Sequence, residues 1–277
     1  MSCYISVEKA KGLVGNYGAP VYIFHADEFE SNYVNLLECM RSIYPKYNIA
    51  YSYKTNYTPK ICSLVKKLGG LAEVVSEMEY TLAKKLGYTS KDIVYNGPVK
   101  GNGLFEHLSN GGVANIDSLD EFETVLIFAK ENPNLNIRIA FRVNIDIEQG
   151  FISRFGLDAY EDTEQKSELD VAVTMAKKQP NIHMVGLHCH IGRSRSLEAW
   201  NRVRIMFKLV DRYFDTAPEF IDLGSGMNSV MEPEFVQQFG DHVPTFDEYA
   251  MFMAYAASLR SADLSRQIGA VITKNNE

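Results

Sequence analysis

The sequence lacks three features that would direct a protein to a membrane, to secretion or to nucleic acid. No apolar run reaches the roughly 18 residues that span a bilayer, and residues 1–8 show no basic segment followed by an apolar one. The net charge of −7 over 277 residues argues against nucleic acid or an anionic membrane as the main partner. We therefore expect a soluble globular protein, long enough for one β/α barrel or two modest domains.

Cysteine is also scarce. The four cysteines, at positions 3, 39, 62 and 189, are scattered without any C-x-x-C pair. Isolated thiols of this kind argue against a disulfide framework and against structural zinc, and they are typical of a reducing cytoplasm. We expect a cytoplasmic protein.

What the sequence does contain is a regular series of short apolar, β-rich runs. They begin near Ala50, Leu71, Ile93, Ala114 and Ile137, at intervals of 21, 22, 21 and 23 residues. Each interval is the length of one strand, one helix and two short loops. Two further runs follow, at residues 185–188 and 220–223. This alternation predicts a parallel sheet, and its steady period favours a closed (β/α)8-type barrel over an open doubly wound sheet.

Helix signals lie between these runs. Thr58-Pro59 predicts a helix start, and so do the Ser-x-x-Glu patterns at Ser76 and Ser118. An earlier strand is predicted at residues 21–25, outside the barrel, before a helix that starts near Asp27. The acidic residues 157–168 are predicted to form a solvated loop before a helix near 166–178.

Polar groups stand where several predicted strands end. Lys54 follows the first strand, Glu73 lies in the second, His188 and His190 end the sixth, and a glycine-rich turn, 222–226, ends the seventh. In a β/α barrel these ends face one mouth, where active sites are built. A partly desolvated lysine there is a suitable nucleophile to hold pyridoxal phosphate (PLP), and a glycine-rich turn can cradle its phosphate.

The two histidines have a second interpretation. Residues at i and i+2 point to the same side of an extended strand, so His188 and His190 could bind a metal. No third ligand stands at a sensible spacing, and we expect no metal. An imidazole opposite the lysine could instead stack on a flat cofactor ring.

Six motifs in chain order resemble one known family. They are Tyr51-Ser52-Tyr53-Lys54-Thr55-Asn56, Ala72-Glu73-Val74-Val75-Ser76-Glu77, Asn115-Ile116-Asp117-Ser118, Arg154-Phe155-Gly156, Gly186-Leu187-His188-Cys189-His190-Ile191-Gly192 and Asp222-Leu223-Gly224-Ser225-Gly226. Together they resemble the fold-type III PLP-dependent amino-acid decarboxylases, above all the diaminopimelate and ornithine decarboxylase group. The resemblance covers about residues 15–250.

The resemblance implies a role for each matching residue. Lys54 would hold PLP covalently, and His190, rather than His188, would stack on the pyridine ring. Gly224, Ser225 and Gly226 would bind the phosphate, while Glu73 and Arg142 match positions near the cofactor. For these last two residues the alternative is a salt bridge at the barrel mouth or a barrel-lining pair.

The sequence also departs from the family. Arg193 stands where serine is usual, and Met227 replaces the usual phenylalanine after the glycine-rich turn. The family's Glu-Pro-Gly-Arg segment, its catalytic cysteine region and its C-terminal β-domain have no counterpart here. Because that glutamate would pair with the pyridinium nitrogen, the sequence predicts PLP binding with weak decarboxylation.

The last residues resemble a different family. Residues 251–272 are similar to the first helix and strand of deoxycytidylate deaminase-like zinc enzymes, although H-x-E and P-C-x-x-C are absent. The alternative is an ordinary amphipathic helix and strand. We divide the chain into a PLP-binding barrel, 1–250, and a tail, 251–277. Since only seven barrel strands are readable, residues 268–272 are predicted to approach the eighth position.

The sequence therefore predicts PLP-dependent decarboxylation of an amino acid such as diaminopimelate or a related basic amino acid. A homodimer is compatible with the resemblance. The alternatives are a barrel-only PLP-binding or carrier protein without turnover, or a non-functional gene fragment.

Overall fold

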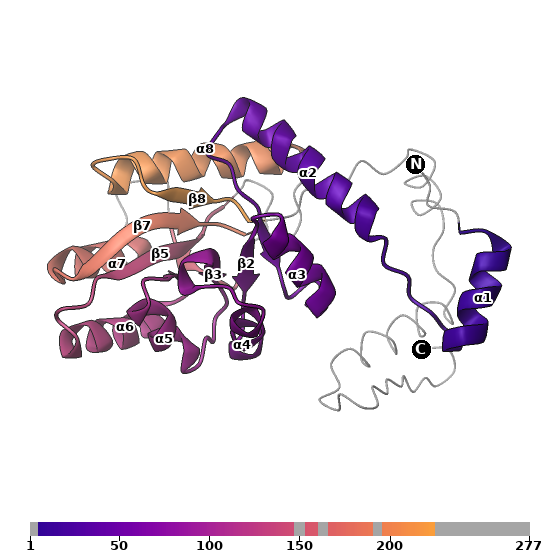
Figure 1. Cartoon of the computed structure of the whole chain (residues 1–277). Helices are drawn as coiled ribbons and strands as arrows, with labels where there is room; N and C mark the ends of the chain where they lie inside the picture. The colour runs from indigo at the N-terminus through magenta and orange to yellow at the C-terminus, as the bar shows by residue number, and fades with distance from the viewer. Residues whose placement is uncertain (1–4, 147–152, 160–165, 191–195, 225–277) are drawn as a thin grey trace, which may run out of the picture. The chain divides into compact units, whose positions relative to one another are not determined.

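Eight parallel strands form one sheet in a computed structural model of the chain, which describes residues 5–146, 153–159, 166–190 and 196–224 (Figure 1). The spatial order is β1-β2-β3-β4-β5-β7-β8, and β6 pairs with β5 beside this path. The strands are β1 Ala50–Ser52, β2 Leu71–Val74, β3 Ile93–Tyr95, β4 Val113–Ile116, β5 Ile137–Asn144, β6 Leu157–Asp158, β7 Ile182–His188 and β8 Phe220–Asp222. All seven strands predicted from the apolar runs are confirmed.

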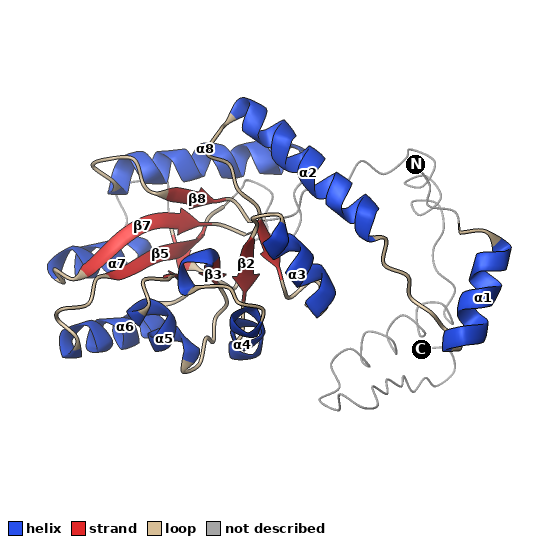
Figure 2. Cartoon of the chain, in the orientation of Figure 1, coloured by secondary structure: helices blue, strands red, loops and turns tan. Residues whose placement is uncertain are grey.

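The structure describes eight helices, and from the third onward they lie between strands along the chain (Figure 2). They are α1 Val7–Tyr17, α2 Ala26–Ile43, α3 Pro59–Lys67, α4 Glu77–Lys85, α5 Gly103–Ser109, α6 Leu119–Glu131, α7 Glu168–Lys178 and α8 Ser196–Tyr213, with a 3₁₀ turn at Ser90–Asp92. The predicted starts are confirmed, because Pro59 opens α3 and the hydroxyls of Ser76 and Ser118 accept the N–H groups of Glu79 and Glu121. Among the described helices, none is long and apolar enough to cross a membrane.

Strand β6, which was not predicted, corrects the prediction for residues 157–168. These residues were expected to form only a solvated loop, but β6 lies within them and pairs with the end of β5. Leu157 is fully buried, and the N–H of Ala159 donates to the carbonyl of Asn144 over 3.0 Å. The last residues of β5, Val143 and Asn144, pair with neither β4 nor β7, and an apolar side chain placed beside them outweighs the surrounding acidic residues.

The predicted strand at residues 21–25 is wrong. These residues are non-regular in the structure, and α2 begins directly after them. Tyr22 is 78% exposed, and Ile23 and Phe24 are also exposed. A strand requires a ladder of hydrogen bonds to a neighbour, and no described strand pairs with this segment.

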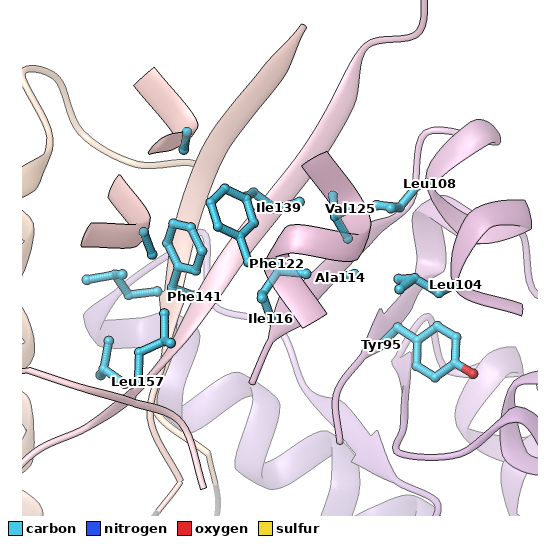
Figure 3. Packing of buried hydrophobic residues seen from close by; sticks show 14 of the residues in the cluster. Tyr95, Leu104, Leu108, Ala114, Ile116, Phe122, Val125, Ile139, Phe141 and Leu157 are labelled. Atoms are coloured by element: carbon cyan, nitrogen blue, oxygen red, sulfur yellow. The ribbon is translucent and has the colours of Figure 1, made fainter. Parts of the chain in front are cut away.

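The hydrophobic core lies between the sheet and the helices. In Figure 3, Phe122 and Val125 of α6 face Ile139 and Phe141 of β5, and the rings of Phe122 and Phe141 meet edge to face with centroids 5.1 Å apart. This packing fixes the helices on the outer face of the sheet and leaves the other face for polar side chains.

The predicted tail lies outside the described residues. The chain divides into one unit of residues 1–226 and a second of residues 227–277, and the second is not described. The placement of 268–272 therefore stays a prediction. Its reason still holds for the described residues, because β6 pairs with the end of β5 and no described strand bridges β1 and β8.

Candidate active site

Alternation along the strands separates core residues from site residues. Ala72 and Val74 of β2 belong to the apolar core, so Glu73 between them points to the opposite, inner face. The same alternation puts Arg142 of β5 and His188 of β7 on the inner face, next to core residues Phe141 and Leu187.

The strand register aligns Arg142 and His188 with a third residue, Asp222 of β8. Arg142 pairs with His188, and His188 pairs with Asp222. The three lie side by side at the carboxyl ends of β5, β7 and β8, as the predicted barrel mouth requires.

Lys54 lies in the turn just beyond β1 at the same end of the sheet. Its side chain is exposed, which corrects the expected partial desolvation. The physical reason is its position, because β1 ends at Ser52 and the lysine projects past the last paired residue.

Positive charges at this mouth act on the imidazole of His190. Burial lowers the pKa of His190 to about 4, helped by the charges of Lys54, His188, Arg142 and Arg202. The imidazole is therefore neutral at pH 7. Lys54 and Arg142 thus lie near enough for their charges to act on His190, while the cofactor roles predicted for the three residues stay predictions.

His188 has a different partner. Its Nδ1 lies 2.8 Å from Oδ2 of Asp222, and Oδ1 of Asp222 accepts the N–H of Gly224 over 2.8 Å. Burial by itself would raise the pKa of Asp222, but the charge and hydrogen bond of His188 and the Gly224 N–H outweigh it and lower that pKa to about 2. Asp222 therefore stays ionised and anchors His188.

The turn after β8 touches the end of β7. Gly224 has φ of +66°, and a Cβ added there would lie 2.7 Å from the carbonyl oxygen of Cys189 and 2.9 Å from Cα of His190. Only glycine allows both this backbone conformation and this approach. The predicted phosphate contacts Ser225 and Gly226, and the departures Arg193 and Met227, lie outside the described residues.

Glu73 and Arg142 do not pair with each other. The side-chain amide of Asn96, which follows β3, donates to Oε1 of Glu73 over 3.0 Å, and the amide of Asn115 of β4 donates in turn to Asn96. Arg142 instead donates to Oδ1 of Asp117 over 2.8 Å. The salt-bridge alternative is wrong for the pair, although Arg142 does form a salt bridge with Asp117.

Asn96 and Asp117 are site residues that sequence reasoning missed. Both interrupt or follow an apolar run directly at a strand end, which is the signal that singled out Lys54. Asn115 and Asp117 stood within a family motif but received no role.

The inner face suits a polar ligand. Buried side-chain atoms without a hydrogen-bond partner among the described residues include Oγ of Ser52 and Oδ1 of Asn115. Buried polar atoms normally find a partner, so these two fit a site that is completed by a polar molecule. Together with the amine of Lys54 and the guanidinium of Arg142, this donor set fits an anionic, flat cofactor such as PLP. Within the described ranges, no group of three or more metal-ligating side chains is present.

Known proteins are similar to the chain over most of its length. A diaminopimelate decarboxylase of Aquifex aeolicus is 29% identical over 248 residues, which cover 83% of this chain and 56% of the relative. A diaminopimelate decarboxylase of Archaeoglobus fulgidus is 28% identical and covers 93% of this chain and 60% of its own length. The chain thus spans a little over half the length of these curated relatives.

Solved structures show the same fold. The crystal structure of diaminopimelate decarboxylase from M. jannaschii in complex with L-lysine has a TM-score of 0.68 and 25% identity, covering 81% of this chain and 56% of that one. The structure of a lysine decarboxylase from Selenomonas ruminantium, at 20% identity and a TM-score of 0.63, supports the fold alone.

The family itself is identified by residues 31–257. They match the family described as "Pyridoxal-dependent decarboxylase, pyridoxal binding domain". That range includes Lys54, Glu73, Arg142, His190 and Gly224, all at the carboxyl ends of the strands. The chain therefore belongs to this family of pyridoxal-dependent decarboxylases, within its pyridoxal binding domain.

Proposed function

We propose that this chain holds PLP covalently through Lys54 and serves in the decarboxylation of an amino acid, diaminopimelate or a related basic amino acid. The observation that carries the proposal is the position of Lys54, Arg142 and His190 at the carboxyl ends of parallel strands, on a face where buried polar atoms have no partner among the described residues. The names of the relatives support the substrate class.

Each residue has a physical task in this proposal. Lys54 is exposed and so accessible to the cofactor aldehyde, and its amine is the covalent attachment point. His190 is neutral at pH 7 and offers a flat ring face rather than a second cation. In the turn that begins at Gly224, the predicted Ser225 and Gly226 would offer backbone N–H groups to the phosphate, because the N–H of Gly224 already donates to Asp222.

Arg142 and Glu73 place opposite charges on the inner face. Arg142 is held by Asp117 and Glu73 by Asn96, so both side chains have fixed positions before any ligand arrives. When bound, PLP supplies an electron sink for the electron pair left at the α-carbon as carbon dioxide departs.

His190 rather than His188 is proposed to face the cofactor. His188 is buried and already bonded to Asp222, which leaves its ring committed to the sheet. Replacing His190 with Ala should weaken PLP binding or change the PLP spectrum more than replacing His188 with Ala, and equal effects would refute this choice.

Spectroscopy of purified protein tests the attachment. With added PLP the protein should develop an absorbance band that free PLP does not show, because the cofactor aldehyde is then bound to an amine. Borohydride reduction followed by peptide mapping should place the label on Lys54. A label on another lysine, or none, would show that the assignment is wrong.

Carbon dioxide release separates the proposed activity from the alternative. Diaminopimelate, lysine, ornithine and arginine are supplied in turn to PLP-loaded protein. Release from one of them supports the decarboxylase. Covalent PLP without release from any of the four would instead identify a PLP-binding or carrier protein.

We also propose that the protein is a cytoplasmic homodimer. The described cysteines 39, 62 and 189 are free thiols, which suits a reducing compartment. Sedimentation equilibrium at micromolar concentration tests the dimer, and a mass of one chain at every concentration would refute it.

A further inference from the structure

Four buried charged side chains form a continuous chain that ends at the proposed cofactor site. Lys100 follows β3, Asp117 follows β4, Glu121 lies in the first turn of α6, and Arg142 lies in β5. Lys100 is 2% exposed, Asp117 5% and Arg142 8%, and the side chain of Glu121 is 9% exposed. Charged groups this deeply buried are rare unless they are paired.

Each link in this chain is a short hydrogen bond. Nζ of Lys100 lies 2.7 and 2.8 Å from the two carboxylate oxygens of Glu121 and 2.7 Å from the carbonyl oxygen of Gly97. Oε2 of Glu121 also accepts the N–H of Asp117 over 2.8 Å. Asp117 then accepts a hydrogen bond from Arg142, so the ammonium of Lys100 is linked to the guanidinium at the mouth.

Stability alone does not account for the buried pair. Burial lowers the pKa of Lys100 and raises that of Glu121, although each partner opposes the effect on the other. An apolar pair of similar volume would commonly fill such a space at no loss of stability. The charges therefore have another reason to be there.

Helix α4, which follows another strand of the same sheet, can be compared with α6. α4 begins like α6, with Ser76 accepting the N–H of Glu79 and Oε2 of Glu79 accepting the N–H of Val75 over 2.8 Å. No lysine among the described residues hydrogen-bonds to Glu79. At the start of α6, the glutamate accepts the N–H of Asp117, which holds a site arginine, and a buried lysine bonds to that glutamate. At the start of α4, the glutamate accepts the N–H of Val75, which holds no arginine, and no described lysine bonds to it.

We propose that Lys100 and Glu121 are positioning residues, which fix the backbone and carboxylate of Asp117 and thereby hold Arg142 at the cofactor site. This inference rests on the proposed function of PLP binding. Neither residue contacts the mouth directly, so both act through Asp117.

The test is the double variant Lys100→Met/Glu121→Leu, which removes both charges and keeps the volume. It avoids leaving one buried charge unpaired. We expect a thermal midpoint near that of the wild type but PLP affinity lowered about tenfold, the usual scale for loss of a supporting shell around a bound group. Lys100→Gln/Glu121→Gln, which restores neutral hydrogen bonds, should recover part of the affinity.

A matched control is Arg212→Met. It removes the ion pair between Arg212 of α8 and Asp170 of α7, where nitrogen and oxygen are 2.9 Å apart. The other described residues that hydrogen-bond to the carboxylate of Asp170 are Ser167 and Tyr213, which are not site residues. Arg212→Met should change the thermal midpoint and leave PLP affinity unchanged.

A cofactor-free measurement keeps this inference separate from the proposed function. In protein without PLP, the pKa of His190 is measured by NMR, with His190→Gln used for assignment. The charged groups that act on His190 are Lys54, Arg142, His188, Arg202 and Asp222. If Arg142 is released, its positive charge acts less on His190, and the pKa of His190 rises in the apolar double variant.

The outcomes are distinct. Wild-type protein that does not bind PLP refutes the proposed function, and the NMR titration then decides the inference alone. Unchanged PLP affinity beside a binding wild type, or an unchanged pKa of His190, overturns the inference. Should the apolar double variant fail to fold, Lys100→Arg carries the same comparison, because its planar group cannot keep all three bonds. Unchanged PLP affinity in Lys100→Arg would also overturn the proposal.

Discussion

The outer and inner faces of the parallel sheet bury different kinds of side chain. On the outer face, Ile139 and Phe141 of β5 pack against the apolar side of α6. On the inner face of the same strand, Arg142 lies next to Phe141 and bonds to Asp117. Adjacent residues thus pack into the apolar core on one face and form a salt bridge on the other.

The two faces differ in the interactions that their buried side chains make. The outer face buries apolar area, and its contribution to stability depends on packing density. The inner face consists of charges and amides that hold one another, and some of its buried atoms still have no partner. Substitutions on the outer face should therefore cost stability, whereas those at the mouth should mainly cost binding.

The largest expected effect is on the outer face. Phe141→Ala removes a fully buried ring from its contact with Phe122 and should lower the free energy of unfolding by about 4 kcal/mol. Denaturant unfolding measures the loss. Ile127→Ala, at a side chain 58% exposed, is the control and should change stability by less than about 0.5 kcal/mol. Equal losses in both variants would contradict the assignment of the core.

The next effect concerns a polar residue within the outer layer. His107 of α5 is fully buried, and its Nε2 lies 3.0 Å from the carbonyl oxygen of Val113. Burial lowers the pKa of His107 to about 4, partly offset by that hydrogen bond. The unfolded chain therefore takes up this proton first, and stability falls by about 3 kcal/mol as pH drops from about 6.5 to about 4.

Unfolding measured between pH 7 and pH 4 tests this expectation. His107→Gln should lose less stability over that range than the wild type, because one proton uptake is removed. His190, whose pKa is also lowered, contributes to both proteins alike. Parallel pH curves for wild type and variant would contradict the role of His107.

A smaller loss in the free energy of unfolding is expected for a substitution at the mouth of the sheet. The folded-state pKa of Asp222, about 2, lies below its ordinary value, so its ionised form contributes stability at neutral pH that is lost as pH falls toward 2. Asp222→Asn should therefore cost about 2 kcal/mol at pH 7 and little near pH 2. It should also weaken PLP binding, since His188 loses its partner.

Asp215→Asn, at an exposed site after α8, serves as the control for Asp222 and should leave both stability and PLP binding unchanged. A pH-independent loss in Asp222→Asn would show that the carboxylate does not act through its charge.

The smallest effect on stability is expected at the most important site residue. Lys54 is exposed beyond the end of β1, so Lys54→Ala should change the free energy of unfolding by less than about 0.5 kcal/mol. The same change should abolish covalent PLP labelling. Lys60→Ala, also exposed, should retain labelling. Retained labelling in Lys54→Ala would break the comparison between the two faces.

Strand and helix positions could be predicted from the sequence because they depend on local signals. The apolar runs and the Ser-x-x-Glu starts recur at a steady period, and all seven strands lie where those runs stand. The position of Lys54 at a strand end could be predicted for a similar reason, since strand ends in a parallel sheet meet at one edge. The choice of His190 over His188 depends on the family resemblance and stays a prediction.

Other features could not be read locally. β6 forms because Leu157 pairs with the last residues of β5, whose position depends on the whole sheet. Residues 21–25 have strand-like composition but no neighbouring strand. Composition fixes a preference, and only a partner can satisfy the backbone hydrogen bonds of a strand.

By itself, the amino-acid order determined the α/β class, the barrel period and the lysine at the strand end. The tertiary structure alone decided how the charges pair: His188 with Asp222, Arg142 with Asp117, and Lys100 with Glu121. These partners are 34, 25 and 21 residues apart in the sequence. Charge pairing depends on distances of about 3 Å and on burial, and both are set only when the sheet brings distant strand ends together.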